Sequence, residues 1–489
     1  MKINIFRIIS LFILLLSMSC QKMERPTMTI IPDPEDDGTI RILAIGNSFS
    51  EDALEDHLYA IAKANGTNII IGNLYIGGAT LAQHVNNVKT NSNAYSFRKI
   101  DMEGNKTTVA NTSIATALAS EKWTHISFQQ ESSNSGMFDT WQQSLAELYN
   151  YVAPRAKNPD VKFILHQTWA YAQNSTHEGF NNYDKDQLKM YAAILDAVEK
   201  AKDLVKIDLV VPAGTAIQNG RTSVVEDNFT RDGYHLSMPL GRYLASATWY
   251  QALTGDNVVG NTYKPQGLSD FEIAIAQNAA NFAIQKPTQV TTMIDFQGGA
   301  GGPLNSSVLL DFGNNSASNN WNQINSFLQG TSINLKDSLG SYVGIKLTIT
   351  ERFNGVNTDG PTTTTTPLNM PSTVSRYSYF GNSKGVFGGL EIKQSTFELS
   401  GLDKDLNYDI SFFGARGAVA DNREAKYICK GTNEVTVALN ASSNTSNIAV
   451  AHAIKPDANG KITVTVTSGD NNNNGSGFYY ITAARLISK

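Results

Sequence analysis

Residues 39–64 read TIRILAIGNSFSEDALEDHLYAIAKA, and the turn within this stretch decides the fold. The apolar run Thr39–Gly46 predicts a strand, and apolar residues at helical spacing over 51–64 predict a helix. Between them, GNSFS places Ser48 where the strand ends and the helix begins. Ser48 is either the N-cap of this helix, with Glu51 completing a capping box, or a nucleophile. Ser50 is a second candidate cap, so the helix does not need Ser48 for capping.

The alternation of strand and helix continues to about residue 253. Strand-like runs follow at 68–76, 123–129, 161–166 and 207–212, and helical patterns from 79 and at about 141–152, 187–201 and 240–253. Strands that alternate with helices predict βαβ units and a parallel sheet covered on both faces. Ligands of such sheets bind at the carboxyl ends of the strands, so the polar stretches there are the first place to look for a site.

The pattern changes in the second half of the chain. One more helix is predicted at 268–285. From residue 290 onward, short alternating runs such as YVGIKLTIT (342–350) and KITVTVTS (461–468) are separated by turns rich in Gly, Asn and Ser. This pattern predicts an antiparallel β-sandwich. The expected organisation is therefore an α/β domain at 39–287 followed by an all-β domain at 288–489.

The first 38 residues predict an exported lipoprotein. A basic start precedes the apolar run Ile8–Leu16, which is shorter than the roughly 20 residues that span a bilayer and so predicts a signal peptide. Small residues before Cys20 resemble a bacterial lipobox, which implies a signal peptide over 1–20 and a lipid anchor on Cys20 in the bacterial outer membrane. Residues 21–38 predict a flexible tether. The alternative is a secretory signal with a free cysteine.

The composition argues against several classes of function. A net charge of −5 over 489 residues, without a Lys/Arg-rich run, argues against a nucleic-acid partner. If Cys20 is acylated, Cys429 has no disulfide partner, and zinc sites built on cysteine clusters are excluded. The histidines show no metal-ligand spacing, so neither a metal nor another cofactor is predicted.

Four polar stretches fall where the carboxyl edge of the sheet is expected. Besides GNSFS, they are IGGATL (76–81), FQQESS (128–133) and, before the last helix of the alternating pattern, TRDGYHLS (230–237). A serine hydroxyl becomes a nucleophile when an imidazole accepts its proton and a carboxylate orients that imidazole. Asp232 and His235 could supply both groups from one loop. The sequence therefore predicts acyl transfer with Ser48.

Acyl transfer also needs hydrogen-bond donors for the negative charge that develops on the carbonyl oxygen. The backbone N–H groups of Ser48 and Gly78 are candidates, because both follow a predicted strand at the same edge. A side-chain amide from Gln129 or Gln130 would complete the set.

In this order, GNSFS, GGATL, FQQES and DGYHLS resemble blocks I, II, III and V of the SGNH (GDSL-like) hydrolase superfamily. The resemblance covers the α/β part and implies a flavodoxin-like α/β/α sandwich. It also implies roles for four residues: Ser48 as the nucleophile, His235 as the base, Asp232 as the group that orients the base, and Gly78, in preference to Gly77, as an oxyanion donor.

Two blocks depart from the usual pattern of the superfamily. Asn47 stands where an Asp usually precedes the serine, and Gln129-Gln130-Glu131-Ser132 stands in place of Gly-x-Asn-Asp. The second departure resembles the Gln-Gly-Glu-Ser variant of carbohydrate and sialate acetylesterases, in which a glutamine assists at the oxyanion hole. The register favours Gln129 for this role, and Gln130 is the alternative.

The resemblance implies a serine esterase that removes short acyl groups, with O-acetyl expected, from a polysaccharide or oligosaccharide. The alternatives are a pectin methylesterase or other carbohydrate esterase with the same triad, and a non-catalytic glycan-binding lipoprotein. Trp169 and Tyr171 follow the fourth strand, where they either stack on a sugar or pack under the loop. Arg221 is predicted to contact an acidic substrate.

Two stretches of the β-rich half, LLDFGNNSASNNWNQIN (309–325) and FYYITAARL (478–486), resemble modules appended to secreted polysaccharide enzymes of gut Bacteroidetes. This resemblance implies either a sugar-binding face or a structural spacer. No individual binding residue is predicted there.

Overall fold

The structure is a computed structural model that describes residues 37–298, 302–313 and 320–489. The elements below lie within Ile40–Lys489, one of the two compact units of the chain. The predicted signal peptide, the lipidation of Cys20 and all but the end of the predicted tether lie outside the described residues. Of the helices in the described ranges, none is both long and apolar enough to cross a membrane.

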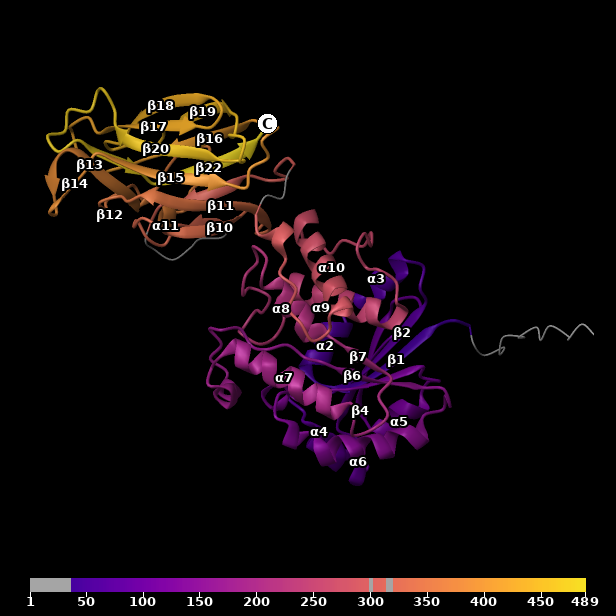
Figure 1. Ribbon diagram of the computed structural model, residues 1–489. Helices are drawn as coiled ribbons and strands as arrows, with labels where there is room; N and C mark the ends of the chain where they lie inside the picture. The colour runs from indigo at the N-terminus through magenta and orange to yellow at the C-terminus, as the bar shows by residue number, and fades with distance from the viewer. Residues whose placement is uncertain (1–36, 299–301, 314–319) are drawn as a thin grey trace, which may run out of the picture. The chain divides into compact units, whose positions relative to one another are not determined.

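A seven-stranded sheet with the order β4-β3-β2-β1-β5-β6-β7 forms the centre of the α/β part (Figure 1). The adjacent strands from β2 to β7 pair in parallel, as predicted. These parallel strands are β1 (Ile40–Gly46), β2 (Ile69–Tyr75), β5 (His125–Phe128), β6 (Lys162–His166) and β7 (Leu209–Val211). The α/β fold predicted from the alternating pattern is confirmed.

The sheet also has an antiparallel edge that was not predicted. β3 (Tyr95–Ile100) pairs antiparallel with β2, and β4 (Lys106–Thr112) pairs antiparallel with β3. All but the last residue of β4 are exposed, so its sequence has no apolar run or alternation to mark it as a strand. The expectation of a wholly parallel sheet is therefore wrong at this edge.

Helices cover both faces of the sheet (Figure 1). One layer has α9 at its centre, packed against α2, α3, α8 and α10. Its members are α2 (Ser48–Leu54), α3 (Leu58–Ala64), α8 (Ala213–Gly220), α9 (Leu240–Thr254) and α10 (Asp270–Gln285). The other face carries α4 (Leu81–Lys89), α5 (Ile114–Ala119), α6 (Gln142–Val152) and α7 (Gln187–Ala201). The three-layer α/β/α arrangement follows.

The helices differ from the prediction at two places. The single helix predicted over 51–64 is two helices, α2 and α3, separated where Glu55 and Asp56 turn toward basic partners on other elements. The other is α8, which was not predicted. Every residue of α8 is buried, so the segment lacks the polar face that makes an amphipathic helix visible in a sequence.

The chain beyond α10 forms three sheets around a shared hydrophobic core. Their orders are β10-β11-β15-β20-β17-β18, β19-β16-β22-β8-β9 and β12-β13-β14 with β21 beside β13. All pairs are antiparallel except β8 with β9. The predicted antiparallel β-sandwich is confirmed. Its elements are β8 (Val308–Asp311), β9 (Trp321–Gln323), β10 (Ser332–Lys336), β11 (Tyr342–Glu351), β12 (Gly355–Asn357), α11 (Ser372–Ser375), β13 (Ser378–Phe387), β14 (Leu390–Ile392), β15 (Gln394–Ser400), β16 (Tyr408–Phe413), β17 (Glu424–Lys430), β18 (Glu434–Asn440), β19 (Ala449–Ile454), β20 (Ile462–Ser468), β21 (Phe478–Ile481) and β22 (Ala483–Ser488).

Candidate active site

The structure brings Ser48, His235 and Asp232 into one hydrogen-bonded line. Ser48 is the first residue of α2, and its Oγ lies 2.9 Å from His235 Nε2, although 187 positions separate the two residues. His235 Nδ1 lies 2.7 Å from Asp232 Oδ2. With the proton on Nδ1 donated to the carboxylate, Nε2 is free to accept the proton of the serine hydroxyl. This arrangement can activate the hydroxyl of Ser48 for nucleophilic attack.

Asp232 is held in the orientation that this geometry requires. Its second oxygen, Oδ1, accepts hydrogen bonds from the backbone N–H of His235 at 2.8 Å and of Tyr234 at 3.2 Å. Partial burial by itself would raise the pKa of Asp232, but the hydrogen bonds from the His235 ring and from the two backbone N–H groups outweigh it and lower the pKa. The carboxylate is therefore charged at neutral pH.

A buried carboxylate on α2 fixes the loop that carries His235. Asp52, which is 0% exposed, accepts a hydrogen bond from the backbone N–H of Leu236 at 2.7 Å. Its carboxylate also pairs with Arg231 at 3.2 Å and with Arg242 at 2.5 Å. Ser48 and Asp52 are four residues apart on the same helix, so one helix carries Ser48 and anchors the loop of His235. That helical spacing was visible in the sequence, but the partners of Asp52 were not.

The N-cap of α2 is Asn47, and the expectation that Ser48 or Ser50 caps the helix is wrong. Asn47 Oδ1 accepts a hydrogen bond from the backbone N–H of Phe49 at 2.9 Å. The Ser50 hydroxyl instead donates toward the backbone oxygen of Asn47 and the side chain of Asn73. The capping function thus falls on Asn47, which leaves the Ser48 hydroxyl for His235.

Near Ser48, the backbone N–H groups of Ser48, Gly77 and Gly78 have no acceptor among the described residues. Gly78 has a φ of +65°, a left-handed conformation that aims its peptide differently from that of Gly77. The neighbouring carbonyl of Ala79 accepts a hydrogen bond from Asn47 Nδ2 at 3.1 Å, which ties the Gly78 loop to the residue before Ser48. The N–H groups of Ser48 and Gly78 can both serve as donors for an oxyanion.

Gln129 and Gln130 differ in how many of their amide hydrogen bonds are used within the protein. Gln130 Oε1 accepts from the backbone N–H groups of Leu81 and Glu131, and its Nε2 donates to both oxygens of Thr140. All of its hydrogen-bonding capacity is therefore used within the fold. Gln129 is 2% exposed and donates one N–H to Asn47 Oδ1 at 2.7 Å, which leaves its second N–H without an acceptor in the described chain. Only Gln129 retains a donor for a ligand.

The substrate contacts predicted for Trp169 and Tyr171 are wrong, because both side chains are 0% exposed. Trp169 stacks on Phe49 with ring centroids 4.3 Å apart and donates its Nε1–H to the carbonyl of Tyr234. The Tyr171 hydroxyl lies 2.7 Å from Ser132 Oγ. Both residues therefore support the loops of the site from beneath, which was the alternative left open by the sequence.

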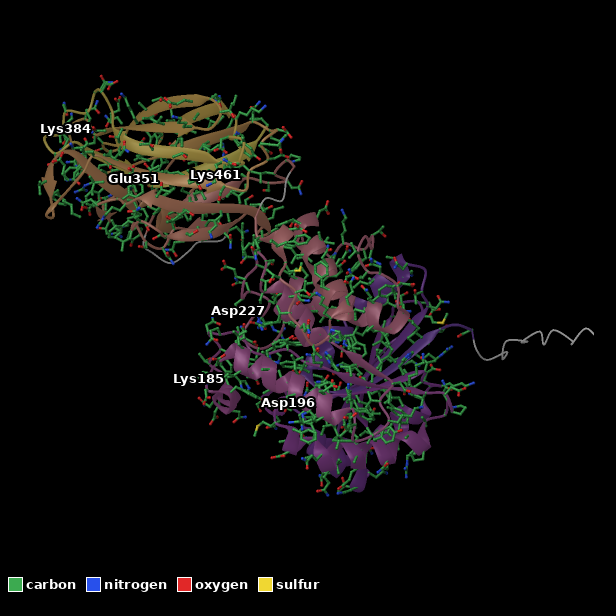
Figure 2. All side chains as sticks on the ribbon, viewed as in Figure 1. Lys185, Asp196, Asp227, Glu351, Lys384 and Lys461 are labelled. Atoms are coloured by element: carbon green, nitrogen blue, oxygen red, sulfur yellow. The ribbon has the colours of Figure 1, made fainter. Side chains whose placement is uncertain are left out.

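The predicted contact between Arg221 and an acidic substrate is also wrong. Arg221 is buried, pairs with Asp227 at 2.8 Å and donates to the backbone oxygen of Ala170. Figure 2 labels Asp227 on the surface of the α/β part. Burial lowers the pKa of Arg221 to about 10, and the carboxylate of Asp227 opposes that shift. Arg221 is a structural cation with a partner inside the protein.

Two aromatic residues that were not predicted as site residues, Tyr234 and His177, pack in series beside His235. The ring of Tyr234 packs on His235 with centroids 4.2 Å apart, and His177 meets Tyr234 edge to face at 4.7 Å. Both are partly exposed. His177 Nδ1 accepts a hydrogen bond from the backbone N–H of Gly179, so its proton is on Nε2. Only the position of Tyr234 beside His235 could have indicated this surface in advance.

Within the described ranges, no group of three or more His, Cys, Asp and Glu side chains is arranged to hold a metal ion.

Comparisons with known proteins agree with the fold. Residues 41–283 match the sequence profile of the family described as domain of unknown function DUF4886. The crystal structure of a DUF4886 family protein from Bacteroides uniformis is 48% identical, covers 53% of this chain and 99% of its own, and has a TM-score of 0.52. The residues matched by the profile, 41–283, include Ser48, Gly78, Gln129 and the DGYH loop. No curated protein matches the chain.

More distant solved structures are similar to a part of the chain. A candidate SGNH hydrolase from Slackia heliotrinireducens is 21% identical over 44% of this chain and 99% of its own, with a TM-score of 0.31. A catalytic mutant of the acetylxylan esterase Axe2 from Geobacillus stearothermophilus is 12% identical over 44% of this chain and 92% of its own, with a TM-score of 0.29. At such identities the likeness concerns the fold alone.

Proposed function

The chain belongs to the DUF4886 family, and from its fold and the Ser48–His235–Asp232 geometry we propose that it is a serine esterase acting on short acyl esters of a complex carbohydrate. The observation that carries the proposal is the 2.9 Å contact between Ser48 Oγ and His235 Nε2. A serine that only capped its helix would not need this imidazole, and the cap is supplied by Asn47.

In the proposed reaction, Ser48 Oγ attacks the ester carbonyl while its proton moves to His235 Nε2. Negative charge on the carbonyl oxygen is stabilised by the N–H groups of Ser48 and Gly78 and by the free N–H of Gln129. The C–O bond to the alcohol then breaks, and His235 returns the proton to the leaving oxygen. His235 then takes a proton from a water molecule, whose oxygen attacks the acyl carbonyl. The bond to Ser48 Oγ breaks, His235 returns the proton to Ser48, and the acid leaves.

The preference for O-acetyl esters on a carbohydrate rests on the resemblance of FQQES to the acetylesterase variant of block III. The partly exposed rings of His177 and Tyr234 support it, because an aromatic face is a surface on which a sugar ring packs. A pectin methylesterase with the same triad is the second candidate, since the same geometry cleaves a methyl ester.

The first experiment is hydrolysis of 4-nitrophenyl acetate by the wild type and by Ser48→Ala. We expect loss of activity by at least about 10³-fold in the variant, together with loss of fluorophosphonate labelling. Ser50→Ala is the matched control, since it lies on the same helix and should retain the label. A glycan-binding protein without an activated serine would leave the wild type unlabelled.

A second experiment identifies the substrate. Acetate and methanol released from acetylated xylan, acetylated pectin, methylated pectin and sialoglycans would be quantified with the wild type. Release of acetate alone supports the carbohydrate acetylesterase, and release of methanol from pectin supports the methylesterase instead.

We also propose that the chain is a lipoprotein anchored to the bacterial outer membrane through Cys20. The proposal is supported by the apolar run Ile8–Leu16 and the small residues before Cys20. Metabolic labelling with an alkyne fatty acid should mark the wild type and leave Cys20→Ser unlabelled. Equal labelling of both would exclude this anchor.

For the β-sandwich we propose a role in binding the polysaccharide, with a structural spacer as the alternative. The resemblance to modules of secreted polysaccharide enzymes supports it. Retention of the Ser48→Ala chain on insoluble acetylated glycans, compared with that of a chain ending at residue 287, would distinguish the two roles if the shorter chain remains folded by circular dichroism.

A further inference from the structure

A buried chain of side-chain hydrogen bonds runs behind the nucleophile. His166 Nδ1 lies 2.9 Å from Gln129 Oε1, and Gln129 Nε2 lies 2.7 Å from Asn47 Oδ1. Asn47 Nδ2 then reaches the carbonyl of Ala79 at 3.1 Å. The three side chains are 1% to 2% exposed, so each hydrogen bond is shielded from water. This series of hydrogen bonds joins the end of β6 to the loop that contains Gly78.

Backbone groups at one end fix which atoms donate and which accept along this series of hydrogen bonds. The N–H of Phe49 can only donate, so the Asn47 atom that it contacts must be the oxygen Oδ1. The carbonyl of Ala79 can only accept, so it faces the nitrogen Nδ2. Both ends of the Asn47 amide are therefore assigned by backbone groups whose roles as donor and acceptor are fixed.

The assignment passes from Asn47 to Gln129 and then to His166. Because Asn47 Oδ1 is an acceptor, Gln129 must present its NH2 group to it, and its oxygen must face His166. His166 Nδ1 must then carry the proton. Flipping the Gln129 amide would place two oxygens together at Asn47, with no proton between them.

The surroundings of His166 agree with this tautomer. In the described chain His166 Nε2 has no hydrogen-bond partner, and the ring packs at 5.2 Å against Trp249, whose indole has no acceptor to take a proton from it. Burial lowers the pKa of His166 to about 3, so the ring is neutral at the pH where an esterase works. His166 is thus a fixed donor toward Gln129.

We propose that His166 is a positioning residue of the oxyanion hole, which locks the Gln129 amide so that one N–H holds Asn47 and the other points to the reacting carbonyl oxygen. This inference rests on the proposed esterase function and extends it to a residue that never touches the substrate. This role explains why a histidine outside the triad lies at the carboxyl end of the core strand β6.

The test compares two substitutions of His166 in the full chain. His166→Phe removes the donor and retains a ring, whereas His166→Asn retains an N–H close to the position of Nδ1. We expect His166→Phe to lower kcat for 4-nitrophenyl acetate by at least about tenfold with KM within about threefold, because loss of an oxyanion donor acts on the transition state. His166→Asn should restore kcat to within about threefold of the wild type.

His125→Phe is the matched control. His125 is also a buried strand histidine, but it begins β5, at the opposite end of the parallel strands from His166, where it contacts Thr124 Oγ1. Its replacement should lower the melting temperature and leave kcat within about twofold. Equal loss of kcat in His125→Phe and His166→Phe, or no rescue by His166→Asn, would overturn the proposal.

The tautomer gives a readout that does not depend on activity. In 15N-histidine-labelled protein, the signal that disappears in His166→Asn should have Nδ1 protonated and Nε2 bare from pH 5 to 8. If the wild type hydrolyses no ester, the proposed function fails, and the tautomer alone then decides whether the chain has the inferred direction. A protonated Nε2 would refute it.

Discussion

The Asp52 carboxylate accepts a hydrogen bond from the backbone N–H of Leu236 at 2.7 Å, across 184 positions of sequence. This contact connects α2, which begins with Ser48, to the loop that carries His235. Arg231, which also pairs with Asp52, donates to the carbonyl of Leu236. The position of His235 relative to Ser48 therefore depends on the buried carboxylate of Asp52.

Replacing Asp52 should damage stability and catalysis together. Asp52→Asn removes the buried carboxylate that pairs with Arg231 and Arg242. We expect this loss to lower the free energy of unfolding by about 3–5 kcal/mol. The His235 loop would loosen, so kcat should fall by at least about tenfold. Urea denaturation and 4-nitrophenyl acetate kinetics measure the two effects.

The control for that substitution is Asp56→Asn, which removes the other partner of Arg242. Because its side chain is 33% exposed, the expected loss is about 1 kcal/mol or less, with kcat within about twofold. The importance assigned to Asp52 would be wrong if the two variants behaved alike.

Adjacent glycines provide a matched pair for the oxyanion hole. Gly78→Ala forces an alanine into a left-handed conformation at φ +65°, which costs about 1–2 kcal/mol or rotates the peptide. We expect kcat to fall by about tenfold or more with little change in KM. Gly77 is not left-handed, and a Cβ there would meet Tyr75 at an ordinary 3.4 Å, so Gly77→Ala should be nearly neutral. The reverse ranking would assign the donor to Gly77.

The lowered pKa of Asp232 predicts a pH effect of known sign. A carboxylate whose folded pKa lies below its unfolded value, about 3.9, stabilises the fold above that value and loses its contribution as the pH falls through the folded pKa. Asp232→Asn should therefore be less sensitive than the wild type to acid below about pH 4. The measurement is the urea midpoint of unfolding of both proteins from pH 2 to 7. The same pH dependence in the wild type and in Asp232→Asn would contradict this prediction.

Asp232→Asn should also reduce catalysis at neutral pH. Loss of the carboxylate removes the acceptor that holds the proton on His235 Nδ1, and we expect kcat to fall by about 10²- to 10⁴-fold. Circular dichroism would confirm that the variant is folded. Wild-type kcat at pH 7 would exclude Asp232 from the triad.

The surface formed by His177 and Tyr234 predicts a dependence on the alcohol part of the substrate. His177→Asn keeps an acceptor for the N–H of Gly179 and removes the ring. We expect KM for an acetylated xylooligosaccharide to rise by about fivefold, and 4-nitrophenyl acetate hydrolysis to change by less than about twofold. His177→Phe keeps the ring and separates packing from hydrogen bonding. Equal effects on both substrates would refute a sugar contact here.

Much of the α/β fold could be predicted because its buried strands are apolar runs and its longer helices are amphipathic. β4 and α8 escaped for opposite reasons. β4 is exposed at nearly every residue, and α8 is buried at every residue, so neither shows a contrast between an inner and an outer face. The hydrophobic pattern detects elements with one face in the core, and it misses those at the two extremes.

The sequence by itself determined that Ser48, Gly78 and the Asp232–His235 pair lie at strand ends or in a loop, because these features depend on residues a few positions apart. Only the tertiary structure decided that Asn47 caps α2, that Gln129 and not Gln130 keeps a free N–H, and that Trp169, Tyr171 and Arg221 are buried. The physical reason is that a polar group is available to a ligand only if no other part of the chain satisfies it. That depends on contacts between residues far apart in sequence.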